Sequence, residues 1–343
     1  MDLGWVGVVL FYVISGFLIT GLLLGSRGEP RYFRRFYARR ALRIFPIYWL
    51  VLAIAIVFAL GTGGAALAPF YALYVQNYFP QIATSFGDGL PLLNHTWTLA
   101  IEEQFYWLWP VAVLVFARRR LLWLVAALIA GAPLARLALL VGTGNPYAAV
   151  ASLPAQADAL AAGALLAILI DRETSLATVR LGGLVALALG IVGTGALVAR
   201  SGLSAFGVTS RWAADPVNVL FLSFLVCALA GVLALTLSTR TLPRVLSAAP
   251  LRNTGRISYG LYLYYPLVIV VTRAATAWAG LDGAVGAARV VVGLAHLAVL
   301  YVVATVSWRY IERPLLGLRT RVPVGSATLP LRMGNVAAID PAP

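Results

Sequence analysis

Long apolar runs recur along this chain of 343 residues and limit what it can fold into. A helix needs roughly 20 mostly apolar residues to cross the hydrocarbon core of a bilayer. The chain is 61% hydrophobic and only 11% charged, whereas soluble domains average about 25% charged residues. We therefore predict an all-α, polytopic transmembrane helix bundle. The predicted spans are nine: 4–24, 43–60, 98–117, 121–141, 155–170, 181–199, 216–237, 257–279 and 286–308.

A tenth apolar segment, around 67–79, is short and contains Pro69, Gln76 and Asn77. We interpret it as re-entrant or interfacial. With nine spans, 21 of the 26 arginines fall on one side of the membrane, and such an excess marks the cytoplasmic side. The protein is thus predicted in the cell membrane, with its N-terminus outside and its C-terminus in the cytoplasm. If 67–79 also crossed, this asymmetry would collapse.

The two ends of the chain carry separate expectations. A first span with an outside N-terminus usually follows another helix, which points to a span missing upstream of Met1. Residues 1–319 are predicted to form one membrane domain, and 320–343, rich in proline and small residues, a disordered cytoplasmic tail. The net charge of +14 comes from arginines in short loops, so the expected partner is the lipid bilayer and not nucleic acid.

Ionisable residues inside spans are candidates for function, because a charge at the bilayer centre costs about 2.5–3.5 kcal/mol. Glu102 and Glu103 lie in the outer half of their predicted span. Arg136 lies toward the outer end of the next span, and Asp158 near the outer start of the one after. Three consecutive helices are therefore predicted to bring these groups to one depth, in a shared polar pocket.

His95 stands just before the span that carries the two glutamates. If the helix extends back to His95, a spacing of seven places His95 and Glu102 within about 20° of one face, which Tyr106 continues. Glu103 points about 80° away and is predicted to pair with an arginine such as Arg136. Two plainer interpretations stay open: the Glu103–Arg136 pair only locks helices together, and His95 is an interfacial histidine.

Arginines are concentrated in the predicted loop 25–43, where seven of them alternate with aromatic residues. One interpretation is anchoring to lipid headgroups. The other is an anionic cofactor, since arginines bind phosphates through paired hydrogen bonds and aromatic rings can stack on a purine. The single cysteine, Cys227, allows neither a disulfide nor a cysteine-based metal site, and no metal is expected.

Five stretches appear in order and together resemble one family. They are VGVVLFYVISGFLIT, FYARRALRIFPIYWL, NHTWTLAIEEQFYWLWP, ISYGLYLYYP and YIERPLL. The chain is similar, over about residues 4–318, to the acyltransferase-3 family of bacterial integral-membrane O-acyltransferases, which modify sugars, cell-wall polymers and macrolides.

The resemblance implies transfer of an acyl group, commonly acetyl, from acyl-CoA to a hydroxyl of a carbohydrate or other acceptor. The candidate acyl-CoA phosphate contacts are Arg34, Arg35, Arg39, Arg40 and Arg43. In the mechanism we expect, His95 is the base, Glu102 orients it and Arg136 stabilises the developing oxyanion. Glu103 completes the predicted catalytic set, and Asp158 and Tyr106 are predicted to contact the substrate.

The chain departs from the family pattern in three places. The family's first helix, which carries an arginine and a histidine, would lie before Met1, so we expect a truncated or misplaced start. Val8 stands where the family often has aspartate, and Tyr265 where it often has histidine. The alternative hypothesis is a non-enzymatic carrier or flippase for lipid-linked sugars, or an inactive remnant. The predicted topology also separates the cytoplasmic arginine loop from the glutamates in the outer half.

Overall fold

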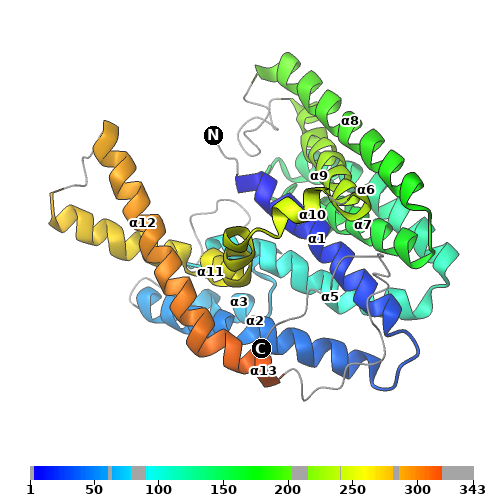
Figure 1. The fold of residues 1–343 in the computed structure, drawn as a ribbon. Helices are drawn as coiled ribbons and strands as arrows, with labels where there is room; N and C mark the ends of the chain where they lie inside the picture. The colour runs from blue at the N-terminus through cyan, green and yellow to red at the C-terminus, as the bar shows by residue number, and fades with distance from the viewer. Residues whose placement is uncertain are drawn as a thin grey trace. The chain divides into compact units, whose positions relative to one another are not determined.

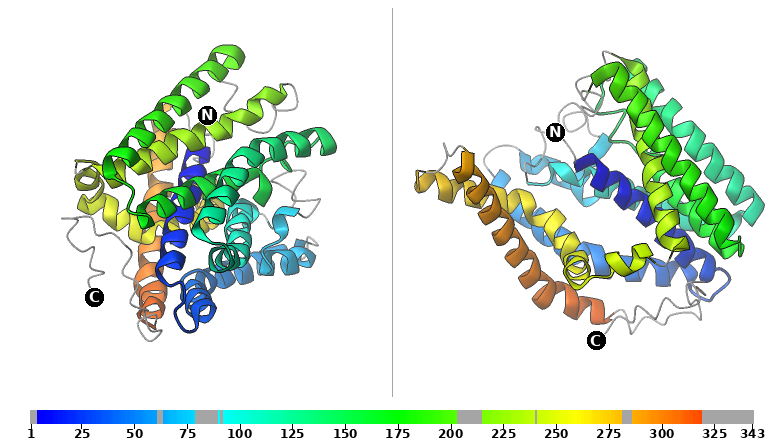
Figure 2. Two further views of the ribbon diagram at one scale, coloured as in Figure 1. Left: turned by 90° about the vertical axis from the view of Figure 1, so that its right-hand side faces the viewer. Right: turned by 45° about the horizontal axis from the view of Figure 1, so that its top comes forward.

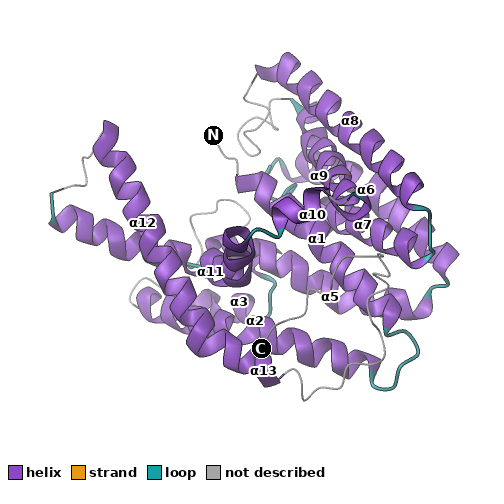
Figure 3. Ribbon diagram, viewed as in Figure 1, coloured by secondary structure: helices purple, strands orange, loops and turns teal. Residues whose placement is uncertain are grey.

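The structure, a computed structural model, describes residues 4–60, 64–78, 90, 92–202, 215–239, 241–280 and 286–318. Within these ranges the chain is helical and contains no strand, as Figure 3 shows, which confirms the all-α prediction. The long helices are α1 (Gly4–Gly25), α2 (Tyr32–Ala59), α5 (Trp97–Val115), α6 (Arg118–Thr143), α7 (Leu153–Asp171), α8 (Leu176–Ser201), α9 (Leu220–Ser238), α11 (Ala249–Trp278) and α12 (Gly286–Ser307) (Figure 1).

Each of the nine predicted spans coincides with one of these long helices. Among the described residues, eight helices are long and apolar enough to cross a membrane. Helix α5 is not one of the eight, because Glu102, Glu103 and Gln104 interrupt its apolar sequence. A polytopic membrane bundle is therefore confirmed, while the count of nine crossings stays a prediction.

The arginine-rich segment is helical over most of its length, so the predicted loop at 25–43 is wrong from Tyr32 onward. Gly28 and Arg31 have φ values of 86° and 62°, in the left-handed region that interrupts a helix. Helix α2 begins directly after them, at Tyr32. Arginine is a good helix former, so the helix begins well before the apolar run from which the span was predicted.

The described part of the segment predicted not to cross, 67–78, and the residues just before it fold into short pieces. They are the 3₁₀ helices Gly64–Leu67 and Gln76–Tyr78 and the five-residue helix α3 (Ala68–Ala72). A crossing needs about 20 helical residues, so the described part of this segment has no helix of spanning length. The remaining short helices are η3 (Asn94–Thr96), η5 (Pro216–Val219), α10 (Thr241–Leu246), a π-helical turn at Trp308–Glu312 and α13 (Arg313–Gly317).

The chain divides into two compact units. Of the described residues, those within 4–33 and 104–239 form the first unit, and those within 34–103 and 241–318 form the second. Two of the boundaries fall inside α2 and α5. The predicted disordered tail, 320–343, lies outside the described residues.

Glycines set the helix packing of the first unit. A Cβ on Gly16 of α1 would lie 1.9 Å from the Leu160 carbonyl oxygen of α7, and one on Gly163 would lie 1.9 Å from the Val13 carbonyl oxygen. The two backbones therefore touch, as small residues permit in membrane proteins. Helices α8 and α9 run side by side in both views of Figure 2 and meet at Gly190 in the same way.

Tyrosine hydroxyls connect the helices of the second unit. Tyr259 of α11 donates to the Ile44 carbonyl of α2 at 2.8 Å, and Tyr48 of α2 donates to the Tyr71 carbonyl of α3 at 2.8 Å. The Gln76 amide donates to the carbonyl of Thr96 at 3.0 Å. Since a backbone group without a partner is costly in a membrane, these hydroxyls and amides hold the irregular segment before α5 in a defined place.

Candidate functional site

His95 lies in the single turn of 3₁₀ helix that leads into α5. Its imidazole is flanked by the rings of Tyr262 and Tyr265, two residues on one face of α11, at centroid distances of 4.8 and 4.7 Å. Both rings meet the imidazole edge to face, each at an interplanar angle of 62°. We call Tyr262 and Tyr265 the tyrosine pair.

The two ring nitrogens of His95 are inaccessible to solvent and hydrogen-bond to none of the described residues. Burial lowers the pKa of His95 from its ordinary value of 6.5 to about 3, and this outweighs the nearby main-chain carbonyl of Tyr262, an acceptor for the ring that raises the pKa. The imidazole is therefore neutral at physiological pH. A neutral imidazole carries one N–H donor and one bare nitrogen that can accept a proton.

The α-helix for which His95 and Glu102 were predicted to share a face does not extend back to His95. Helix α5 begins at Trp97, and His95 precedes it in a 3₁₀ turn, which advances by three residues per turn and not 3.6. Glu102 is 4% exposed and forms an ion pair with Arg40 of α2 at 3.5 Å.

This ion pair also corrects the predicted separation between the arginine segment and the carboxylates. Arg40 belongs to the basic first turns of α2 and yet pairs with Glu102, so the arginine segment and one of the two carboxylates are in contact. The other candidate acyl-CoA contacts are on the same helix: Arg34 and Arg43 are exposed, and Arg35 and Arg39 are partly buried. The Nε atom of Arg39 is inaccessible and bonds to no described residue.

Glu103 is the second buried carboxylate of the second unit, with 5% of its surface exposed. Its Oε1 atom has no hydrogen-bond partner among the described residues. The phenols of Tyr48, Tyr74 and Tyr259 lie near enough to interact with its charge. A buried carboxylate oxygen without a partner is costly, so this oxygen is available to a ligand or a water molecule.

Arg136 pairs with Asp158 and not with Glu103, so the predicted Glu103–Arg136 pair is wrong. In the first unit, Arg136 of α6 donates through Nη2 to Asp158 Oδ2 of α7 and to Ser223 Oγ of α9, the latter at 2.8 Å. Ser223 donates to the same Asp158 oxygen at 3.0 Å. Arg136 is fully buried. These contacts tie three helices together, as in the interpretation of a structural lock.

Tyr106, predicted to contact the substrate, is buried in the first unit and donates to Ser15 Oγ of α1 at 3.4 Å. The predicted site residues thus fall into two groups. His95, both glutamates and the five arginines belong to the second unit, and Tyr106, Arg136 and Asp158 to the first. The prediction that all of them line one chamber stays a prediction.

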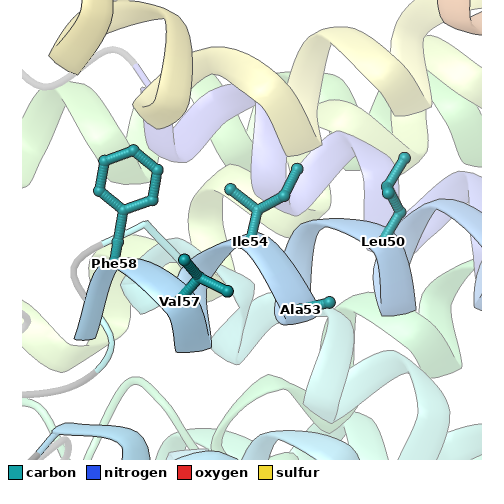
Figure 4. A pocket seen from close by; sticks show the side chains of 5 residues that line it. All are labelled: Leu50, Ala53, Ile54, Val57 and Phe58. Carbon is teal, nitrogen blue, oxygen red and sulfur yellow. The ribbon is translucent and has the colours of Figure 1, made fainter. Parts of the chain in front are cut away.

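A hollow of about 370 Å³ lies on α2, lined by side chains that are all apolar (Figure 4). They are Leu50, Ala53, Ile54, Val57 and Phe58. A hollow without a polar group offers neither a base nor an oxyanion donor. Its walls suit a lipid acyl chain.

Sequence reasoning missed two residues that contact the predicted set. Tyr262 donates its hydroxyl to the His95 carbonyl at 2.6 Å. Its position within ISYGLYLYYP was visible in the sequence, but nothing there assigned it a partner. Ser223 had no sequence signal, because an isolated serine in an apolar helix usually bonds within that helix.

The chain is similar in sequence to proteins named as O-acetyltransferases. Peptidoglycan O-acetyltransferase OatA of Listeria monocytogenes is 27% identical over 333 residues, which cover 91% of this chain and 51% of the relative. O-acetyltransferase OatA of Staphylococcus aureus is 26% identical over 362 residues, covering 97% and 56%. Putative peptidoglycan O-acetyltransferase YrhL of Bacillus subtilis is 35% identical over 127 residues, covering 33% and 20%. The chain spans about half the length of the longer-matching relatives.

No solved structure matches the chain. The model of the acyltransferase-3 family, described as an acyltransferase domain, matches residues 3–311. This range contains every candidate site residue and nearly all of the described helices. The chain therefore belongs to the acyltransferase-3 family.

Proposed function

We propose that this protein is a membrane-embedded O-acetyltransferase that transfers acetyl from acetyl-CoA to a hydroxyl of a cell-wall carbohydrate. The observation that carries the proposal is the neutral His95, whose buried ring nitrogens have no described partner. The family and the relatives named as peptidoglycan O-acetyltransferases support the reaction class and the acceptor. The donor is inferred from the basic start of α2.

In this mechanism the bare nitrogen of His95 takes the proton of the acceptor hydroxyl as its oxygen attacks the thioester carbonyl carbon. The C–S bond then breaks, the CoA sulfur leaves, and the imidazolium returns its proton to that sulfur. Burial makes the imidazolium costly, but the negative charge that develops on the substrate at the same moment offsets that cost. An acetyl ester and free CoA are the products.

The arginines of α2 supply positive charge for the phosphates of the donor. Arg39 is the best candidate among them for binding a phosphate, because its guanidinium is partly buried and forms no hydrogen bond or ion pair with a described residue. Arg40 holds Glu102 at 3.5 Å, so the donor-binding residues and a carboxylate of the proposed site are in contact. A donor bound along these turns has only a short distance to the buried carboxylates.

The test uses the purified protein reconstituted in lipid vesicles, with acetyl-labelled acetyl-CoA and soluble peptidoglycan fragments. We expect labelled ester that depends on the fragments, and loss of at least 100-fold in rate for His95→Ala, in line with the 10²–10⁴-fold contribution typical of a general base. His296→Ala is the matched control, since His296 is the only other histidine and lies on α12. We expect it to retain activity.

Two outcomes would contradict the proposal. If the wild-type protein forms no ester but moves lipid-linked sugar across the vesicle membrane, the carrier hypothesis replaces it. If the wild-type protein acetylates and His95→Ala does so equally well, the reaction class stands and the role of His95 is wrong.

A further inference from the structure

His95 is held in place by a hydrogen-bonded chain that starts on α11. The Tyr262 hydroxyl donates to the main-chain carbonyl of His95 at 2.6 Å. The same hydroxyl lies 2.5 Å from Thr98 Oγ1. Thr98 is itself buried, with 3% of its surface exposed. One phenol therefore joins α11 to the 3₁₀ turn that precedes α5 and to the first turn of α5.

The same tyrosine also contacts the imidazole. Its ring meets the His95 ring edge to face, and Tyr265, one turn later on α11, does so from a second direction. Edge-to-face pairs of this kind contribute about as much as a weak hydrogen bond and fix the angle between the rings. The hydroxyl thus sets the backbone position of His95, and the two rings set its side-chain orientation.

The need for such an external support follows from the local backbone. His95 lies in a single 3₁₀ turn, where hydrogen-bond geometry is poorer than in an α-helix. Glu102, which the sequence suggested as the orienting group, is paired with Arg40. Neither ring nitrogen of His95 bonds to a described residue, so within the described chain its orientation depends on packing and on the Tyr262 bond.

We propose that Tyr262, supported by Thr98, is the positioning residue for His95: it fixes the backbone carbonyl and ring angle of the histidine so that a bare ring nitrogen faces the acceptor hydroxyl. This inference rests on the proposed function, because it gives His95 the role of base. It assigns no chemistry to Tyr262 itself. A base displaced by about 1 Å loses on the order of 100-fold in rate, which sets the scale of the expected effect.

The kinetic test compares Tyr262→Phe with Tyr264→Phe in vesicles. Both variants remove one hydroxyl from α11, but the Tyr264 hydroxyl bonds to Ser307 Oγ at 3.0 Å, whereas the Tyr262 hydroxyl bonds to His95. We expect Tyr262→Phe to lower kcat by ten- to 100-fold, with the KM for acetyl-CoA unchanged. Tyr264→Phe should leave both constants near those of the wild type.

A second measurement reads the histidine directly and does not need activity. The chain has only two histidines, so ¹⁵N-histidine labelling in a His296→Gln background gives the ring signals of His95 alone. We expect Tyr262→Phe to broaden or shift these signals. Tyr264→Phe should leave them unchanged.

The outcomes separate the inference from the function on which it rests. If kcat and the His95 signals of Tyr262→Phe match the wild type, the positioning role is wrong even though His95→Ala is inactive. If both tyrosine variants lose activity and thermal stability equally, the effect is structural and the inference is overturned. If the wild type is inactive with every acceptor, the proposed function fails, and the labelled spectra still decide whether Tyr262 holds His95.

Discussion

At the scale of single residues, the central feature is a histidine kept neutral by its surroundings. The His95 ring packs against the tyrosine pair, and no charged group acts on it among the described residues. Its pKa is lowered to about 3, whereas in an unfolded chain it is about 6.5. Between these values the unfolded chain binds more protons than the folded one. Stability due to this residue is therefore complete above about pH 6.5 and is lost as pH falls below it.

A prediction follows for thermal unfolding in detergent. Replacing His95 with glutamine removes the group that takes up a proton on unfolding, so the variant should lose less stability between pH 7.5 and pH 5 than the wild type. The quantity to measure is the difference between the two midpoints at each pH. Midpoints that fall in parallel would show that His95 is already accessible to protons in the folded state.

Arg39 gives a second residue-scale prediction, on donor affinity. Its partly buried guanidinium has no ion pair with a described residue, so phosphate binding costs no existing contact. We expect Arg39→Ala to raise the KM for acetyl-CoA about tenfold, consistent with loss of a charge-assisted bond of about 1.5–3 kcal/mol, and to change kcat little. The control is Arg252→Ala, an exposed arginine of α11. Equal KM values for the two variants would remove Arg39 from the donor site.

At the scale of helices, the sequence predicted well where the helices lie along the chain, but it predicted poorly which side chains meet between them. Apolar runs locate helices because lipid exposure demands them, and all nine runs became helices. The pattern also placed Arg136 and Asp158 at one depth on neighbouring helices, yet it matched Arg136 with Glu103. Which of two acids an arginine reaches depends on helix rotation and crossing, and these are set by side-chain packing that a single sequence does not display.

The buried ion pair between Arg136 and Asp158 leads to a prediction about the stability of the helix packing. Asp158→Ala should destabilise the first unit by about 3–5 kcal/mol, because it leaves a buried guanidinium without its carboxylate. The double variant Arg136→Met with Asp158→Leu should recover most of that loss, since apolar side chains of similar size often replace a buried ion pair without cost. The measurement is unfolding of both proteins in detergent.

Activity of the same double variant decides what Arg136 does. A folded double variant that still acetylates confirms a lock between helices. A folded variant without activity would place Arg136 in the chemistry, as the sequence suggested.

The close approach of α1 and α7 can be tested by replacing a glycine at their crossing. A methyl group on Gly16 would overlap the Leu160 carbonyl oxygen, so Gly16→Ala should force the helices apart and cost about 1–3 kcal/mol or more. Gly131→Ala on α6 is the matched control, because a Cβ there meets nothing within 4 Å and alanine favours a helix. We expect the control to be neutral or slightly stabilising. Equal destabilisation by both would contradict the close crossing.

At the scale of the whole molecule, the sequence predicted the class of protein and its family but not the arrangement of its site. Composition and run length indicated a membrane bundle, and five ordered motifs indicated the family whose model matches residues 3–311. The shared face of His95 and Glu102 was predicted for a helix that extends back to His95, whereas the backbone enters α5 through a 3₁₀ turn. The sequence also separated Glu102 from the arginine segment, because their positions were counted from the ends of the predicted spans. The ion pair with Arg40 of α2 brings the two together.

The central claim is that this membrane domain carries its own acetyl-transfer chemistry, with the neutral His95 as base. The most direct measurement is acceptor-dependent formation of labelled acetyl ester from acetyl-CoA in vesicles, by wild type, His95→Ala and His296→Ala in parallel. The account predicts ester from the wild type and from His296→Ala, and at least 100-fold less from His95→Ala. Ester formation by His95→Ala at the wild-type rate would contradict it.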